Sequence, residues 1–266
     1  MIVLDHALPS LGGRTVRELI VVAGGLAIVA AECLRPGPVD VGNLIVYVVA
    51  TLLFALRCFA ARAAGVGACI GAIVQQWPNL RLGEVTPETL AILPLAGIAV
   101  LASSDLVERY ERAPSRIAWL PNPWAGFTAA ETRSLRWATY AAGALAGLLD
   151  HTTQLMAWAP LYGLAAPWWP RIAMVSLVLA VAVLCLGRAV GALLVWVTAI
   201  VVAIHSAPLA WQAEALLGPL VAGPARLPLV YQLAAHYLLP VVLLASAAAI
   251  VTTPAVARLL RHTVRG

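Results

Sequence analysis

The sequence contains no lysine and few charged residues of any kind. Charged residues make up 11% of its 266 residues, whereas 62% are apolar and the mean hydropathy is +0.91. A soluble domain of this length needs about a quarter of its residues charged to cover its surface. The shortage of charge therefore excludes an ordinary water-soluble fold and predicts that lipid surrounds much of the chain.

Motifs for nucleotide binding and hydrolysis are also absent. The chain has no GxxxxGK[ST] phosphate loop, no HExxH and no GxSxG. Its four cysteines form no CxxC pair, so neither a disulfide framework nor a structural zinc site is indicated. If the chain belongs to an energised transporter, a separate subunit has to bind the nucleotide.

Long apolar stretches bounded by charge, proline or tryptophan predict an all-α, polytopic transmembrane bundle in one domain, residues 1–266. A spanning helix needs about 20 mainly apolar residues. Pro87 is placed for a first helical turn, and Thr128 and Glu131 have the spacing of a capping box. Glycines inside the apolar stretches, such as Gly25 and Gly67, indicate close helix packing. The eight expected helices cover approximately residues 18–34, 43–61, 63–77, 88–104, 130–157, 171–187, 189–206 and 229–252.

The distribution of arginine predicts the orientation of these helices. Cytoplasmic loops retain positive charge, and an inside N-terminus places thirteen of the seventeen arginines on the cytoplasmic side. The four outside are Arg35, Arg81, Arg171 and Arg226. We therefore expect both termini in the cytoplasm of a bacterium and a multi-pass location in its inner membrane. The net charge of +5 is then a consequence of topology and does not indicate nucleic-acid binding.

Three histidines are expected at a similar depth, in the outer third of the membrane. Ionisable groups inside a bilayer are functional candidates because they are costly to insert. The histidines could ligate a metal, hold haem or copper, or relay protons beside a substrate path. Alternatively, each one hydrogen-bonds locally at an interfacial helix end. The candidate ligands or relay residues are Glu32, Asp150, His151, Gln154, His205, Gln232 and His236, of which Asp150, His151 and His236 are the candidate metal ligands.

The cytoplasmic connection from Asp105 to Thr132 is the second candidate site. A charged amphipathic stub followed by a proline-stiffened turn is suited to docking a cytoplasmic partner, and its arginines are equally suited to contacting anionic lipid headgroups. The candidate docking residues are Arg109, Arg112, Arg116, Trp119 and Trp124.

These features favour a permease-type subunit of a multi-component transporter, with the energy source on another subunit. The alternatives are a membrane subunit of a redox complex that binds haem or copper through the outer histidines, and an intramembrane enzyme acting on lipid-linked substrates. An assembly subunit without chemistry of its own is a further alternative. The expected partners are the lipid bilayer and other membrane or cytoplasmic subunits.

Overall fold

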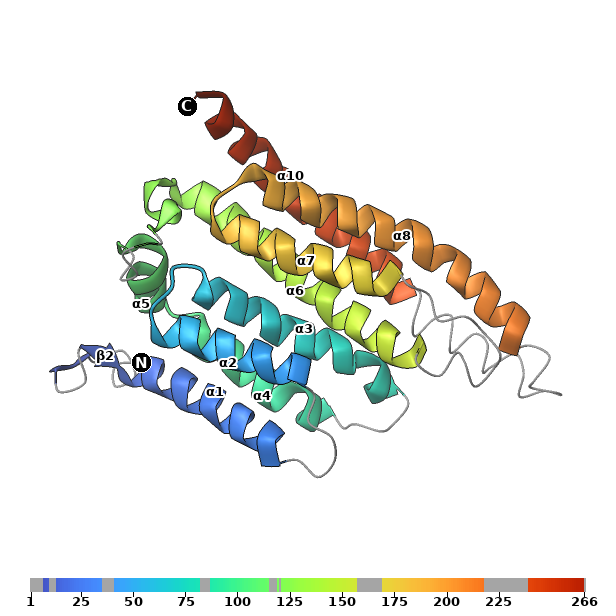
Figure 1. Cartoon of the computed structure of the whole chain (residues 1–266), viewed down its shortest axis with the longest axis horizontal. Helices are drawn as coiled ribbons and strands as arrows, with labels where there is room; N and C mark the ends of the chain where they lie inside the picture. The colour runs from blue at the N-terminus through green and yellow to red at the C-terminus, as the bar shows by residue number, and fades with distance from the viewer. Residues whose placement is uncertain are drawn as a thin grey trace. The chain divides into compact units, whose positions relative to one another are not determined.

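The computed structural model describes residues 7–9, 13–34, 41–81, 87–114, 119, 121–156, 169–217 and 239–265. These residues are predominantly helical, which confirms the all-α class (Figure 1). The chain divides into two compact units. Unit 1 comprises residues 1–66 and 95–127, and unit 2 comprises residues 67–94 and 128–266.

Unit 1 begins with a short ribbon that the hydropathy pattern did not predict. Strand β1 (Ala7–Leu8) pairs antiparallel with β2 (Arg14–Thr15). Gly13 lies between the strands with φ 69°, a left-handed conformation that glycine adopts without strain. The ribbon leads directly into the first helix, so its polar groups lie next to the N-terminus of that helix.

Four long helices contribute to unit 1, two of them only through one end. Helix α1 spans Val16–Leu34 and α2 spans Val41–Ala55. Helix α3 (Ala61–Arg81) contributes its first turn, and α4 (Pro87–Leu101) contributes its last two turns. The starts of α1 and α3 and the ends of α2 and α4 therefore lie at one end of the unit.

The expected charged stub after α4 is folded into short helical pieces. Helix α5 (Ser104–Leu106) continues into the π-helical turn η2 (Val107–Arg112), and a 3-10 turn, η3, spans Pro123–Gly126. The side chain of Asn122 accepts a hydrogen bond from the Trp124 amide and so caps η3. The described part of this connection therefore contains more helical structure than a simple loop has.

Helix α2 ends in a Schellman motif that has an arginine where glycine is usual. The Cys58 amide donates to Leu53 O and the Arg57 amide donates to Phe54 O, at 2.9 and 3.0 Å. Arg57 has φ 53° and is the one non-glycine residue with positive φ in the described part of the chain. A second Schellman motif ends α7, where Gly187 takes the equivalent position with φ 67°.

The described residues of unit 2 form four long helices besides its parts of α3 and α4. These are α6 (Ala129–Met156), α7 (Trp169–Cys185), α8 (Ala189–Leu217) and α10 (Leu239–Arg265). Thr128 and Glu131 form the predicted capping box, since each backbone amide donates to the other side chain, at 2.9 and 3.3 Å.

Helices α8 and α10 extend beyond their expected ranges. Helix α8 runs through residues expected to form an outer connection after 206, and α10 continues from the expected end at 252 to Arg265. The threonine hydroxyls at 252 and 253 bond to carbonyl oxygens one turn back, beside the helix-internal Pro254. The basic residues of the last turns also suit the negative end of the helix dipole.

Two pairs of glycines allow α3 and α6 to pack backbone against backbone. Gly67 and Gly71 on α3 face Gly143 and Gly147 on α6, and each pair has Gly-x-x-x-Gly spacing. A methyl group added to Gly143 would collide with the Gly67 carbonyl, and one added to Gly147 would collide with the Gly71 carbonyl. This geometry confirms the close packing expected at Gly67 and is typical of helices that associate in lipid.

The described helices bury leucines and many small side chains, and they also leave many large apolar side chains exposed. The core of unit 2 contains many alanines, among them Ala138, Ala192 and Ala255. Leu34 and Ile250 are 82% and 72% exposed, and α1, α2, α7, α8 and α10 all carry further exposed leucine, isoleucine or valine. One helical window of the described residues, Val242–Arg261, is long and apolar enough to cross a membrane.

Candidate functional site

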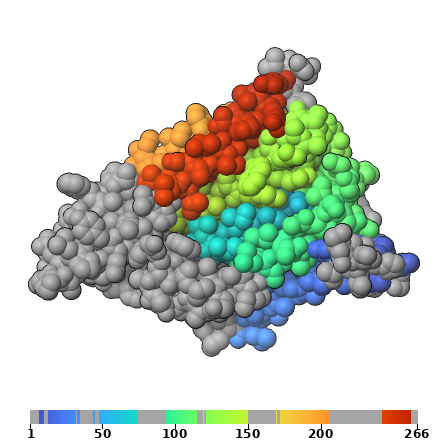
Figure 2. Space-filling model, turned by 180° about the vertical axis from the view of Figure 1, so that it is seen from behind, coloured from blue at the N-terminus to red at the C-terminus, as the bar shows by residue number. Residues whose placement is uncertain are grey.

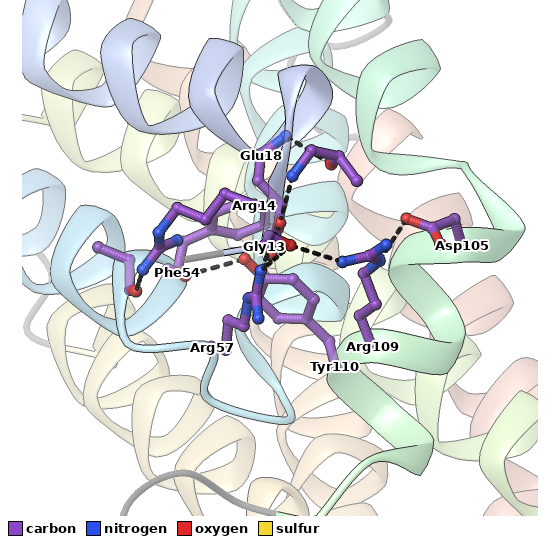
Figure 3. A network of polar contacts seen from close by, with 10 residues as sticks. Gly13, Arg14, Glu18, Phe54, Arg57, Asp105, Arg109 and Tyr110 are labelled. Atoms are coloured by element: carbon purple, nitrogen blue, oxygen red, sulfur yellow. Dashed lines mark hydrogen bonds and ion pairs between the residues drawn. The ribbon is translucent and has the colours of Figure 1, made fainter. Parts of the chain in front are cut away.

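The arginines of unit 1 converge on the end where its helices start and stop. They come from the ribbon, from the first turns of α1 and α3, from the α2–α3 turn and from the α5–η2 segment; Figure 3 labels Arg14, Arg57 and Arg109 among them. There they meet two buried acidic side chains and several backbone carbonyl groups. We call this cluster the arginine joint. Its described arginines are Arg14, Arg17, Arg57, Arg62, Arg109 and Arg112.

Glu18 and Arg57 form the centre of the arginine joint. The Arg57 Nε lies 2.5 Å from Glu18 Oε1, and its Nη2 donates to Glu18 Oε2 at 2.7 Å. Glu18 also closes a capping box at the start of α1, because its carboxylate accepts from the Thr15 amide at 2.8 Å and its amide donates to Thr15 Oγ1 at 3.2 Å. The Glu18 side chain is fully buried, so one carboxylate both caps α1 and neutralises a buried cation.

The Gly13 carbonyl joins the ribbon to two of these arginines. It accepts from Arg57 Nη2 at 3.1 Å and from Arg109 Nη1 at 3.0 Å. Arg109 in turn lies 2.7 Å from Asp105 one helical turn earlier. A single backbone oxygen therefore connects the ribbon, the α2–α3 turn and the α5–η2 segment.

Tyr110 fixes η2 against the end of α2. Its hydroxyl donates to Phe54 O at 2.9 Å, and its ring lies 4.6 Å from the Phe54 ring, centroid to centroid. Burial raises the pKa of the Tyr110 hydroxyl, since the phenolate would lose its hydration, and the nearby Glu18 carboxylate raises it further. The hydroxyl therefore acts as a neutral hydrogen-bond donor.

Two further arginines satisfy the carbonyl groups that helix ends leave free. Arg14 donates to Ala55 O at the end of α2. Arg17 donates to Ala99 O and Val100 O in the last turn of α4, at 3.2 and 3.0 Å. The last turn of a helix has no backbone donors for its carbonyls and carries partial negative charge, so a guanidinium stabilises it there.

A second buried ion pair anchors the end of η2. Arg62 Nη1 lies 2.5 Å from Glu111 Oε1, and both side chains are excluded from solvent. The Asn122 side chain donates to Glu111 O and Ala113 O, at 2.9 and 2.8 Å. Trp124 is 1% exposed, and its ring lies 6.1 Å from that of Phe59.

One side of this connection faces outward. Arg112 pairs with Glu108 at 2.5 Å, with both side chains about half exposed. Trp119 is 81% exposed. Of the five expected docking residues, Arg112 and Trp119 thus face outward, Arg109 is tied inward and Trp124 is a buried anchor. Arg116 lies outside the described residues.

The outer histidines are only partly within the described structure. His205 is exposed on α8 and stacks on Trp169 of α7, with ring centroids 6.0 Å apart. Asp150, His151 and Gln154 lie on the last two turns of α6, and Glu32 lies near the end of α1, but the description of these four positions extends to the backbone only. Gln232 and His236 lie outside the described residues.

Metal and haem binding at the histidines remain hypotheses from the sequence. Among the described residues, no three His, Cys, Asp or Glu side chains are grouped so that they could hold a metal ion. The residues that the structure does bring together, Glu18, Arg57, Glu111 and Arg62, were not among the sequence candidates. The sequence does contain a signal that could have identified Glu18, because the Thr15-x-x-Glu18 spacing repeats that of Thr128 and Glu131.

Comparisons of the chain with protein-family models, with curated proteins and with solved structures found no match.

Proposed function

We propose that the chain is a multi-pass subunit of a bacterial inner membrane that docks a cytoplasmic partner through residues 104–126, as a permease-type transporter subunit would. In this proposal the partner supplies the energy, and the substrate path runs between the helices. We call residues 104–126 the docking segment.

The exposed surface supports membrane embedding. Val178 and Ile204 are each 62% exposed, and similar residues follow one another along α1, α7, α8 and α10. Soluble proteins rarely expose contiguous apolar patches above about 300–600 Å², because water disfavours them. Cores of alanine and glycine pairs that bring backbones together are likewise typical of helices that pack in lipid.

The arginine-rich ends support the orientation. In unit 1, α1 and α3 start, and α2 and α4 end, at the arginine joint. In unit 2, Arg258 near the end of α10 donates to Ala130 O and to Ser134 Oγ near the start of α6. Among the described side chains, each unit thus gathers arginines at one end of its helices, and arginine-rich ends are typical of the cytoplasmic side.

The observation that carries the docking proposal is the division of the docking segment into an anchored side and an outward side. Tyr110, Glu111 and Trp124 are buried, while Glu108, Arg112 and Trp119 are exposed. Tryptophan and arginine are enriched in interface hot spots, and both residue types are exposed on this anchored segment. Movement of a bound partner would be transmitted to the end of α2 and the start of α3, because Tyr110 bonds to Phe54 and Glu111 pairs with Arg62.

Recovery of a cytoplasmic partner with the tagged protein tests this function. Trp119→Ala together with Arg112→Gln should lower the amount of co-purified partner by about tenfold or more, as expected for loss of a hot spot. Exposed Trp196→Ala, on α8, is the matched control and should leave recovery unchanged. Equal recovery with both variants would contradict docking at this segment. Recovery of the wild-type chain from the soluble fraction would contradict membrane embedding.

A further inference from the structure

The α6–α10 seam of unit 2 carries a second basic surface. Arg258 on α10 bonds to Ala130 O and, at 2.8 Å, to Ser134 Oγ on α6. These bonds hold the start of α6 beside the last turns of α10. Figure 2 shows the two helices side by side on one face of unit 2.

On α6, the exposed side of this seam bears Arg133 and Trp137. Successive helical residues are about 100° apart around the axis. Ser134 faces α10, so buried Leu135 lies on one side of it and exposed Arg133 lies on the other. Trp137, one turn later, is 52% exposed and packs edge-on against Tyr140 at 5.7 Å.

On α10, Arg261 lies on the exposed side of the seam. Buried Leu259 lies about 100° from Arg258 in one direction, and exposed Arg261 lies about 60° from it in the other. Both helices bury their opposite sides in the same core. Their exposed sides therefore border the seam from the same outer face, where Arg133 and Arg261 flank Arg258.

The charges along this seam are almost all positive. Helix α10 contains no acidic residue, and the carboxylate nearest the start of α6, Glu131, is already bonded to the amide and hydroxyl of Thr128. Three arginines therefore face one occupied carboxylate. A tryptophan at the apolar edge of such a basic surface is suited to the boundary between acyl chains and headgroups.

We propose that this seam binds the headgroup of an anionic phospholipid, with Arg133 and Arg261 contacting the phosphate, Arg258 holding the helices together beneath it and Trp137 packing on the first acyl carbons. Basic surfaces between membrane helices on the cytoplasmic side have the charge and depth that anionic headgroups need. The proposal rests on the membrane embedding proposed above, but it does not depend on the docking segment.

Thermal unfolding of the purified protein in neutral detergent tests the site. Added phosphatidylglycerol should raise the unfolding temperature, whereas phosphatidylcholine and inorganic phosphate should not. Arg133→Gln with Arg261→Gln should weaken the apparent affinity for phosphatidylglycerol by about tenfold or more, because each arginine near an anionic headgroup contributes substantially. Replacement of both by lysine should retain most of the response, and Arg188→Gln, in the exposed α7–α8 turn, should retain all of it.

Each contrary result has a separate meaning. An equal response to phosphatidylglycerol in wild type and double glutamine variant would overturn the proposed site. An equal response to inorganic phosphate would show an anion site without lipid selectivity and would also overturn it. If the double variant does not fold, the single variants Arg133→Gln and Arg261→Gln carry the test, each with a partial loss expected. Failure of the wild-type chain to enter membranes would instead overturn the proposed function.

Discussion

The Arg57 guanidinium binds both carboxylate oxygens of Glu18 while the Arg57 backbone holds a left-handed conformation, φ 53°. Such a conformation costs an L-residue about 1–2 kcal/mol, and glycine avoids most of that cost. Gly187 fills the equivalent position after α7. The presence of arginine at this position is therefore explained by its side chain, because a glycine there could not pair with Glu18.

Arg57→Gly separates the backbone effect from the side-chain effect. The variant should relieve the strain at φ 53° but leave the buried Glu18 carboxylate without its cation. Removing one partner of a buried pair costs about 3–5 kcal/mol, which exceeds the strain relieved by about 1–2 kcal/mol. We expect a net loss of stability, measured by denaturant unfolding in detergent.

The double variant Arg57→Gly, Glu18→Gln provides the matching control. Glutamine keeps the capping box at the start of α1 but removes the charge. Most of the lost stability should return, giving a coupling energy well above the error of the cycle. Additive losses would mean that the two side chains do not interact as the geometry indicates.

Glu111→Gln should loosen the docking segment. The change leaves Arg62, which is 5% exposed, without a counter-charge, and loss of a buried partner costs on the order of 3 kcal/mol. Tryptic cleavage within residues 104–126 should become about tenfold faster or more, because local opening becomes more frequent. Glu108→Gln breaks only the half-exposed pair with Arg112 and should change the cleavage rate little.

Gly71→Ala and Gly143→Ala should destabilise unit 2. Each added methyl group would collide with a backbone carbonyl on the opposite helix, and overpacking typically costs about 1–3 kcal/mol. Gly24→Ala is the control, since no atom outside its own helix lies within 4 Å of the added carbon and alanine favours helix by about 0.5–1 kcal/mol. If Gly24→Ala lowered the unfolding temperature more than the other two variants, the result would contradict this packing.

Single cysteines at residues 34 and 119 test the orientation. Leu34 and Trp119 are both more than four-fifths exposed. Leu34 ends α1 and Trp119 follows α4, so three long helices, α2, α3 and α4, separate them in the sequence. In a background without native cysteines, an impermeant reagent outside intact cells should label Leu34→Cys and miss Trp119→Cys. The opposite pattern would invert the topology, and labelling of both sites would contradict the helix count between them.

Alkaline titration tests the burial of Tyr110. Because the folded state raises the pKa of this hydroxyl, its contribution to stability is complete below the ordinary tyrosine range, about pH 10, and falls as the pH rises through the raised value. Tyr110→Phe should match wild type in phenolate absorbance up to about pH 10 and lack one ionising group only at higher pH. A difference that appears within the ordinary range would contradict the burial.

Most of the helices could be predicted from the sequence. Their apolar runs end within a few residues of a helix break such as Gly187, so both signals give nearly the same boundary. The capping box at Thr128 was predictable for the same reason. The ends of α8 and α10 were not, since hydropathy shows where the apolar run stops and not where the helix stops. Short polar helices such as η2 also carry too little periodicity to be recognised.

The arginine joint was less predictable than the helices. Glu18 and Arg57 are 39 positions apart, and no local pattern pairs them. Arg57 also occupies a position where sequence rules expect glycine or asparagine. Trp124 looked like a contact for a partner because it follows a proline-rich turn, whereas its burial depends on Phe59, far away in sequence.

The facing glycines of α3 and α6 also set the axial register of the two helices. A surface of alanine methyls is nearly uniform, so two such helices could slide past each other by one residue with little change in contact energy. At Gly67 and Gly143 that slide would bring a β-carbon against a carbonyl oxygen. The shape of the two surfaces therefore favours the correct alignment of the helices. A chain with few charged residues can thereby specify one arrangement among many that are equally apolar.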